Sequence, residues 1–237
     1  MYKKILVTVI LSLLVASSVF ADRRKYVWTY QSATTLKDHA ELEFYQTTKI
    51  DLTNSWEYRI ELENGLTDNL DLAVYQIFSQ EENAPFKWEA FQIRMRYRFV
   101  ERGKFFLDPV FYLEYRKKTD GELQDKIEAK LLLGKDFSKS NFSINPVYEY
   151  KWNHGDAMNE IGLDVGISYS PSFKLSIGLE STTRYEMINN ADNKTGSYFG
   201  PTISFASGSF YYTFGYAAGL TDDSNDARAR LLIGISL

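Results

Sequence analysis

The sequence of 237 residues contains no cysteine and only two histidines. Without cysteine the chain forms no disulfide, and it carries no lipid anchor of the lipoprotein type, which is attached through a cysteine. Basic residues are not in excess either, since 27 lysines and arginines stand against 31 acidic residues and the formal net charge is −4. This balance argues against a nucleic-acid partner, which would favour a basic face.

Long apolar runs are also missing, apart from one over residues 5–15. Lys3 and Lys4 precede this run and small residues follow it up to Ala21, which is the pattern of a secretory signal peptide. The run is shorter than the roughly 20 residues that a membrane-spanning helix needs. We therefore expect residues 1–21 to be a signal peptide that is cleaved after Ala21. A mature membrane protein would then have to be a β-barrel, the other fold that satisfies its backbone inside lipid.

Apolar and polar residues alternate through most of the chain after residue 38. In residues 56–63 every even position is apolar and every odd one is charged, and residues 91–99 and 161–169 show the same alternation. A period of two is typical of a strand with two different faces. Cutting the chain at turn residues predicts strands near 39–51, 54–66, 69–80, 86–100, 104–118, 126–137, 141–152, 158–170, 172–186, 196–206, 208–219 and 226–237.

The connections between these segments alternate in length, with tight turns at 67–68, 101–103, 138–140, near Pro171 and at Ser207. Short periplasmic turns, longer outer loops and an even strand number are typical of bacterial outer-membrane barrels. The sequence thus predicts an all-β fold, a transmembrane antiparallel up-and-down β-barrel of about 12 strands over residues 39–237. Aromatic residues flank the tight turns on the apolar face, and Trp88 fits the alternation only if a β-bulge shifts the register.

The predicted location is the outer membrane of a Gram-negative bacterium, with outer-membrane lipid and lipopolysaccharide as partners. The last strand alternates up to Leu237, as in the C-terminal signal that the barrel-assembly machinery reads, although such signals usually end in Phe. Residues 22–38 fit no spanning strand cleanly. We expect an N-terminal periplasmic or lumenal segment there, which fills the lumen, contacts the periplasmic rim or extends the first strand.

The polar face of the strands would line the lumen, and it is strongly charged. The predicted charge network consists of Glu41, Glu43, Glu57, Arg59, Glu61, Glu63, Arg94, Arg96, Arg98, Glu114, Arg228 and Arg230. In one interpretation, acids and bases on adjacent strands pair and, with buried tyrosines, largely fill a small barrel. In the other, the ladder of Arg94, Arg96 and Arg98 faces an acidic wall across water and orients polar solutes, as charged rings do in porins. A barrel of twelve strands is intermediate in size between barrels of about 8 strands, which side chains fill, and porins of about 16 strands, which enclose a channel. The filled interpretation is favoured.

Enzymatic and metal-binding functions are not expected. Some outer-membrane lipid hydrolases carry a His and a Ser two residues apart on one strand, but neither His39 nor His154 is followed by such a Ser. Residues 221–226 resemble half of a calcium loop, but the loop Gly and the bidentate Glu are missing. No catalytic, cofactor-binding or metal-binding residue is predicted, and no cofactor.

Two segments carry a resemblance to a known family. Residues 34–43 read TTLKDHAELE, and residues 58–75 include ENGLTDNLDLAVY. They resemble a family of uncharacterised bacterial outer-membrane β-barrel proteins with a T-L-x-x-G-x-x-E-x-E opening and an E-x-G-L-T-D turn. Asp38 stands where the family has Gly. The resemblance covers roughly residues 26–80 and implies architecture and location, and no functional residue is carried over because the family has no established activity.

The leading hypothesis is therefore a narrow porin-like passage for small polar solutes. The alternative is a closed structural or surface-interaction barrel without transport, and the third hypothesis is a lipid hydrolase barrel.

Overall fold

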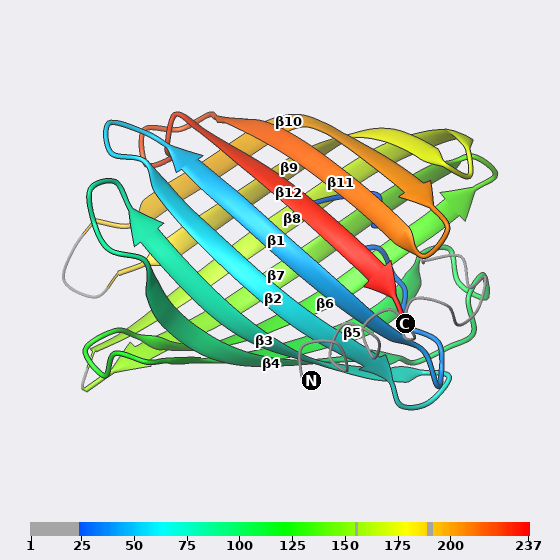
Figure 1. Ribbon diagram of the computed structural model, residues 1–237, viewed down its shortest axis with the longest axis horizontal. Coiled ribbons are helices and arrows are strands. Elements are labelled where there is room, and N and C mark those ends of the chain that lie inside the picture. Colours follow the sequence, from blue (N-terminus) through cyan, green and yellow to red (C-terminus); the bar gives the residue numbers. More distant parts are fainter. Residues whose placement is uncertain (1–23, 155, 189–191) are drawn as a thin grey trace, which may run out of the picture.

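A computed structural model describes residues 24–154, 156–188 and 192–237, so the predicted signal peptide lies outside the described residues. The described chain forms twelve strands (Figure 1): β1 Ala40–Ile50, β2 Ser55–Gly65, β3 Leu70–Glu81, β4 Lys87–Arg98, β5 Asp108–Lys118, β6 Asp125–Phe137, β7 Ser140–Asn153, β8 Asp156–Ser172, β9 Leu175–Met187, β10 Lys194–Ser207, β11 Phe210–Gly219 and β12 Ala227–Ser236. Each strand pairs antiparallel with its neighbours, and β1 pairs with β12 to close the barrel. The prediction of a closed antiparallel barrel of about twelve strands is confirmed. Among the described residues no helix is long and apolar enough to cross a membrane.

The side chains are distributed inside out relative to a protein that folds in water. On β2, Glu61 and Glu63 are 0% and 3% exposed, whereas Ile60 and Leu62 are 45% and 47% exposed. The alternation seen in the sequence thus places charges in the lumen and apolar side chains on the outer surface. An apolar outer surface of this extent is costly in water, but it suits the hydrocarbon of a bilayer.

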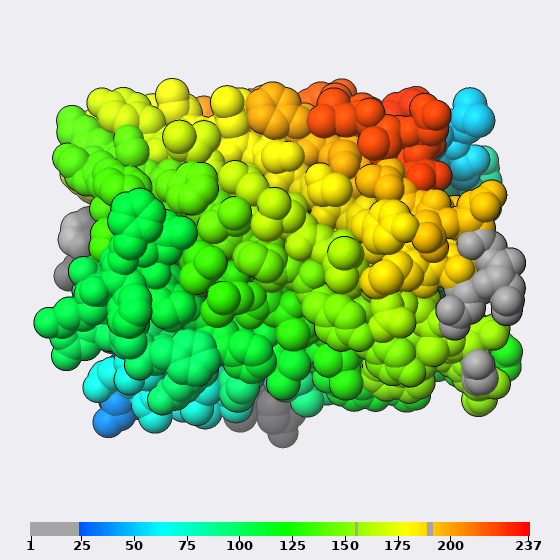
Figure 2. Space-filling model, turned by 180° about the vertical axis from the view of Figure 1, so that it is seen from behind, coloured from blue at the N-terminus to red at the C-terminus, as the bar shows by residue number. Residues whose placement is uncertain are grey.

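The outer wall is continuous, as Figure 2 shows for the face that β5 to β9 form, in green to yellow. Large aromatic side chains are exposed where several strands end, among them Tyr97, Phe99, Phe105 and Phe173. Such rings are favoured where a bilayer meets water, because they are apolar in body and tolerate a polar boundary. Their position follows the aromatic belt that the sequence predicts.

A β-bulge interrupts the pairing of β3 with β4. Ile77 pairs with Ala90 and Phe78 pairs with Trp88, so Glu89 is an extra residue on β4. The extra residue reverses the alternation beyond it and turns Trp88 outward, where it is 53% exposed. The predicted bulge at Trp88 is confirmed.

The two ends of the barrel differ in their connections. The end that holds Leu237 and the start of β1, here called the terminal end, has two-residue turns after β6, β8 and β10. The opposite end, here called the loop end, carries the connections after β1, β3, β5, β7, β9 and β11 (Figure 1, left).

One predicted tight turn was wrong. The connection between β4 and β5 spans residues 99–107 instead of 101–103, and β5 begins at Asp108 instead of near residue 104. The Asp108 carboxylate accepts hydrogen bonds from the backbone N–H of Gly103 at 2.7 Å and of Phe105 at 3.4 Å. These bonds hold residues 99–107 in a loop at the terminal end, so these residues do not pair as part of β4 or β5.

The two segments that carry the family resemblance meet at the terminal end. The backbone N–H of Asp38 donates to the carbonyl of Gly65 at 3.1 Å, and that of Gly65 donates to the carbonyl of His39 at 3.0 Å. A Cβ added at Gly65 would lie 1.9 Å from the carbonyl oxygen of Leu36, so only glycine allows this approach. Asp38 has a φ of 62°, the left-handed conformation that glycine, Asp and Asn tolerate best.

Candidate functional site

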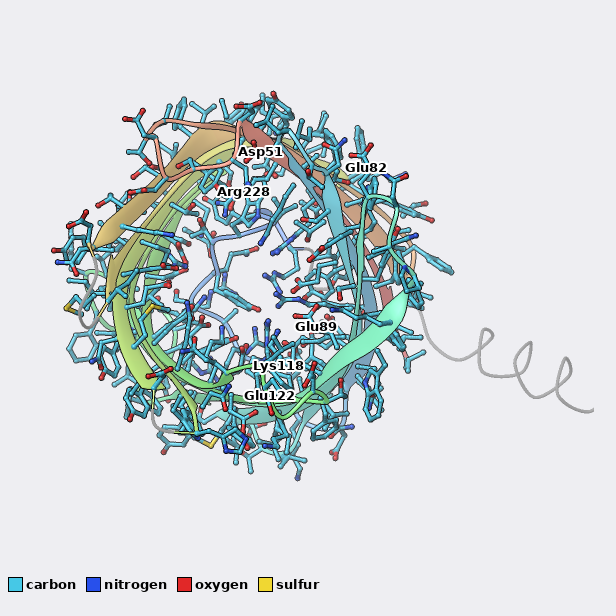
Figure 3. The ribbon with its side chains drawn as sticks, turned by 90° about the vertical axis from the view of Figure 1, so that its left-hand side faces the viewer. Asp51, Glu82, Glu89, Lys118, Glu122 and Arg228 are labelled. Carbon is cyan, nitrogen blue, oxygen red and sulfur yellow. The ribbon has the colours of Figure 1, made fainter. Side chains whose placement is uncertain are left out.

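Residues 24–35, here called the N-terminal segment, lie inside the barrel, where Figure 3 shows their blue chain within the lumen. Its backbone is held by side chains and does not pair with a strand. The Glu180 carboxylate on β9 accepts hydrogen bonds from the backbone N–H of Val27, Trp28 and Thr29 at 2.8, 2.9 and 2.7 Å. Since a buried carboxylate and buried N–H groups both need partners, this contact satisfies each of them.

A second anchor lies on β7. The Asn145 side chain accepts a hydrogen bond from the backbone N–H of Tyr30 at 2.7 Å and donates to its carbonyl at 3.1 Å. Tyr26 donates its hydroxyl to the side chain of Asn141 at 2.9 Å. Burial raises the pKa of the Tyr26 phenol, so the hydroxyl stays protonated and remains a donor. The segment is therefore fixed by specific contacts along its length.

Small lumenal residues leave room for the segment. A Cβ added at Gly166 on β8 would lie 2.7 Å from the Tyr26 ring, and one at Gly215 on β11 would lie 2.3 Å from a methyl group of Val27. Around them the lumenal positions of β7 to β11 are mostly small: Ser143, Ser168, Ser176, Ser204 and Thr213, all buried. The barrel wall on this side is thus shaped to the segment.

An acid–base group, here called the inner cluster, fills the opposite wall and consists of Glu43, Glu61, Glu63, Asp71, Arg94 and Arg96. Arg94 is fully buried, pairs with Glu61 at 2.9 Å and also contacts Glu63. Arg96 pairs with Asp71 at 2.8 Å, because the two residues are register partners on β4 and β3. The N-terminal segment joins the cluster through the hydroxyl of Thr35, which donates to Glu63.

The structure places Arg94 and Arg96 in direct contact with acids on β2 and β3, so the arginine ladder does not face an acidic wall across water. Arg98 does not join the inner cluster. It lies at the terminal rim and donates to Asn69 at 3.1 Å. Glu41 also lies toward this end, where the Tyr211 hydroxyl donates to it at 3.3 Å.

A cavity of about 470 Å³, here called the vestibule, occupies the loop-end half of the lumen. Figure 3 looks into the barrel from this end, with Asp51 and Glu122 at the rim and Arg228 inside the wall. Nine basic and seven acidic side chains line the vestibule. Five belong to the predicted charge network: Glu57, Arg59, Glu114, Arg228 and Arg230. Trp28 and Tyr30 of the N-terminal segment also line it, so the segment forms part of its floor.

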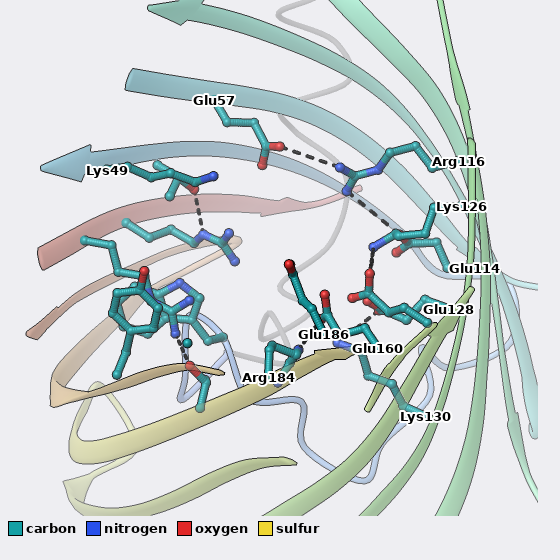
Figure 4. Close-up of a pocket in the computed structure, with 18 of the residues that line it drawn as sticks. Lys49, Glu57, Glu114, Arg116, Lys126, Glu128, Lys130, Glu160, Arg184 and Glu186 are labelled. Atoms are coloured by element: carbon teal, nitrogen blue, oxygen red, sulfur yellow. Dashed lines mark hydrogen bonds and ion pairs between the residues drawn. The ribbon is translucent and has the colours of Figure 1, made fainter. Parts of the chain in front are cut away.

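One side of the vestibule is a network of ion pairs, seen at the right of Figure 4. Lys126 lies 3.4 Å from Glu114, 3.1 Å from Glu128 and 3.4 Å from Glu149. Glu57 is paired with Arg59 at 2.7 Å. Partly buried charges that are paired in this way keep a polar, hydrated wall without an uncompensated charge.

The opposite side, formed by β12 and β1, is organised around two arginines. Arg230 donates to the carbonyl of Val27 at 2.9 Å and to Thr47 at 2.8 Å. The guanidinium of Arg228 packs against two rings, 4.4 Å from the centre of Trp28 and 4.1 Å from that of Tyr198. Both arginines thus contact the N-terminal segment from the vestibule side.

At the mouth of the vestibule, the turn after β1 is tied to the connection after β11. Asn225 donates to the Asp51 carboxylate at 2.8 Å, and this hydrogen bond lowers the pKa of Asp51. Asp223 accepts a hydrogen bond from the backbone N–H of Thr195 at 2.7 Å. Asp223 and Asn225 belong to residues 221–226, the segment that resembles half of a calcium loop. Their side chains are engaged in hydrogen bonds within the protein.

Sequence reasoning did not find the role of Glu180, and it missed Asn141 and Asn145 altogether. The signal that could have found them is the run of small residues at the lumenal positions of β7 to β11. Small side chains on half of a wall leave a space, and close packing requires that something fill it. Residues 22–38, which fit no spanning strand cleanly, offered a candidate for that space.

A closed twelve-stranded barrel with an apolar outer surface and a charged lumen defines the class of outer-membrane-type β-barrels. Among solved structures, an outer-membrane channel from Pseudomonas putida F1 is similar with a TM-score of 0.65 and 10% identity, over 90% of this chain and 99% of that one. The KdgM porin in complex with disordered oligogalacturonate is similar with a TM-score of 0.58 and 8% identity, over 83% and 97%. The NanC porin has a TM-score of 0.56 and 11% identity, over 84% and 98%. No protein-family model matches the sequence, and no curated protein is significantly similar to it.

Proposed function

We propose that the protein is an integral outer-membrane barrel that gives small polar solutes a narrow, porin-like passage. Solutes enter the vestibule at the loop end, which faces the outside, and the N-terminal segment restricts the half of the lumen toward the periplasm. The observation that carries the proposal is the charged vestibule of about 470 Å³ with Trp28 and Tyr30 at its floor. The shared fold with a channel and two porins supports it.

The size and chemistry of the vestibule set the class of solute. A cavity of this volume is in the range of pockets for small molecules, and its paired charges favour water and polar groups over apolar ones. The inner cluster and the N-terminal segment leave little free space at the terminal end, where a second cavity measures only about 30 Å³. Passage is therefore expected to be slow and selective for size.

Conductance in planar bilayers tests the proposal. The wild-type chain should give small discrete steps, and a variant that lacks residues 24–35 should give larger ones, because the lumen then loses the segment that fills it. Both proteins should first show the heat-modifiable gel migration of a folded barrel. A closed bilayer at all voltages with both proteins would contradict any passage through this barrel.

A closed structural or surface-interaction barrel is the second candidate, and the buried inner cluster favours it. Arg94 and its acidic partners are fully packed, and they stabilise a filled barrel whether or not solutes cross it. This candidate predicts that the wild-type barrel stays closed while the variant without residues 24–35 conducts. A lipid hydrolase is the third candidate, and comparing lipid turnover before and after His154→Ala tests it.

A further inference from the structure

We infer that the side of the vestibule formed by Lys49, Arg228 and Arg230 binds small solutes that carry two or more oxyanion groups, either carboxylates or phosphates. This inference rests on the proposed function, because it assigns a class of solute to the proposed entrance. It concerns an equilibrium binding site, so it can be tested apart from passage.

Charge is unevenly compensated around the vestibule. Four of the nine basic side chains, those of Lys49, Lys194, Arg228 and Arg230, make no ion pair with any residue that the structure describes. The other five all do. The Nε of Arg228 is buried and lacks a hydrogen-bond partner among the described residues. The paired side of the vestibule is thus close to neutral, and the side opposite carries an excess of positive charge.

Two of the acids that line the vestibule, Glu57 and Asp223, are already engaged by other groups. Glu57 is held by Arg59 at 2.7 Å and lies 3.7 Å from Arg116. Asp223 accepts the backbone hydrogen bond from Thr195. Neither acid pairs with Lys49, Arg228 or Arg230, so the positive charge remains available to a solute.

The backbone brings three of the four cations together. Lys49 and Arg228 are register partners on β1 and β12, and Arg230 is the next residue of β12 on the same face. Register partners lie about 5 Å apart at their Cα atoms, and alternate residues of a strand lie about 7 Å apart. Figure 4 shows Lys49 across the cavity from Lys126 and Glu128. A solute with two or three negative charges matches this spacing, whereas a single charge would leave the cluster largely uncompensated.

The guanidinium of Arg228 is held in place before any solute arrives. The rings of Trp28 and Tyr198 pack against it, and one of its terminal N–H groups donates a hydrogen bond to the Thr182 hydroxyl. A guanidinium edge donates parallel hydrogen bonds that match the two oxygens of a carboxylate or a phosphate. Because two rings already pack against the guanidinium, the site favours oxyanions over neutral rings.

Titration calorimetry on the full chain in detergent micelles tests the inference, with citrate and inorganic phosphate as probes at constant ionic strength. The wild-type protein should bind citrate saturably. Lys49→Gln and Arg228→Gln should each weaken binding about tenfold, the factor that a lost charge-assisted hydrogen bond represents. Lys117→Gln removes an equal charge from a residue that pairs with Asp125 and is 57% exposed, and it should leave the affinity unchanged.

The two probes separate the sources of the oxyanion, since binding of citrate alone identifies carboxylates and binding of phosphate alone identifies phosphates. The inference is overturned if neither probe binds the wild-type protein saturably, or if both variants bind like the wild type. If Arg228→Gln does not fold, Lys49→Gln decides, because that side chain is exposed at the mouth. Conductance without binding would overturn this inference alone, and binding without conductance would overturn only the proposed passage.

Discussion

At the scale of single residues, Glu180 differs from the other lumenal acids because its partners are backbone groups. It makes no ion pair with any described residue and accepts three backbone N–H bonds from residues 27–29. Glu180→Gln leaves one acceptor oxygen and turns the other position into a donor that faces N–H groups. We expect the amides of residues 27–29 to exchange hydrogen at least about tenfold faster, measured by mass spectrometry.

The matched control for that change is Glu186→Gln, at the vestibule rim, where Glu186 lies 3.7 Å from Lys151 and makes no recorded contact with the N-terminal segment. In the Glu186→Gln variant, the amides of residues 27–29 should exchange as in the wild type. Equal exchange in both variants would show that Glu180 does not anchor the segment.

Arg94 is the residue whose loss should cost the most stability. Arg94→Met removes a partner that Glu61 and Glu63 share and leaves the buried Glu61 without an ion-pair partner among the described residues, whereas Glu63 keeps Arg96. We expect a loss of about 3–5 kcal/mol in the free energy of unfolding, measured by urea titration in lipid vesicles. Arg98→Met, at the rim, should cost about 0–1 kcal/mol, the range of an exposed polar contact. Equal losses of stability in the two variants would show that burial does not determine how much each arginine contributes.

The residues of the charge network could be predicted because the alternation fixes which face of a strand each side chain takes. Their partners could not, since pairing depends on register and on which wall a residue shares. Lys49 and Arg228 are 179 positions apart in the printed sequence and become neighbours only because β1 closes on β12. For the same reason, the sequence does not predict that one side of the vestibule is ion-paired and the other is basic.

At the scale of elements, the strands were predictable and the irregular segments were not. A strand of about ten residues carries its own signal in its alternation, and even the bulge at Trp88 followed from a break in it. The connection at 99–107 and the N-terminal segment carry no such period, because side chains such as Asp108, Glu180 and Asn145 fix their course.

The fit between β11 and the N-terminal segment gives a prediction at this scale. Gly215→Val should push the segment out of place, because even an added Cβ would lie 2.3 Å from a methyl group of Val27. Overpacking of this kind costs about 1–3 kcal/mol, and we expect that cost in urea unfolding of the full chain. In the variant without residues 24–35 the same substitution should cost nothing. A cost that persists in the shortened chain would mean that Gly215 is needed by the strand itself.

At the scale of the whole molecule, the apolar outer surface predicts how the barrel depends on lipid. Leu163 is 40% exposed near the middle of β8, whereas Leu52 is fully exposed in the turn after β1. If the barrel spans a bilayer, Leu163→Arg places a charge in hydrocarbon and should cost about 2–4 kcal/mol in vesicles, while Leu52→Arg at the edge should cost about 0–1 kcal/mol. Urea unfolding in vesicles and in detergent micelles measures both. Equal costs at the two positions in vesicles would contradict a membrane-spanning orientation, because a charge in hydrocarbon costs more than one at the bilayer edge.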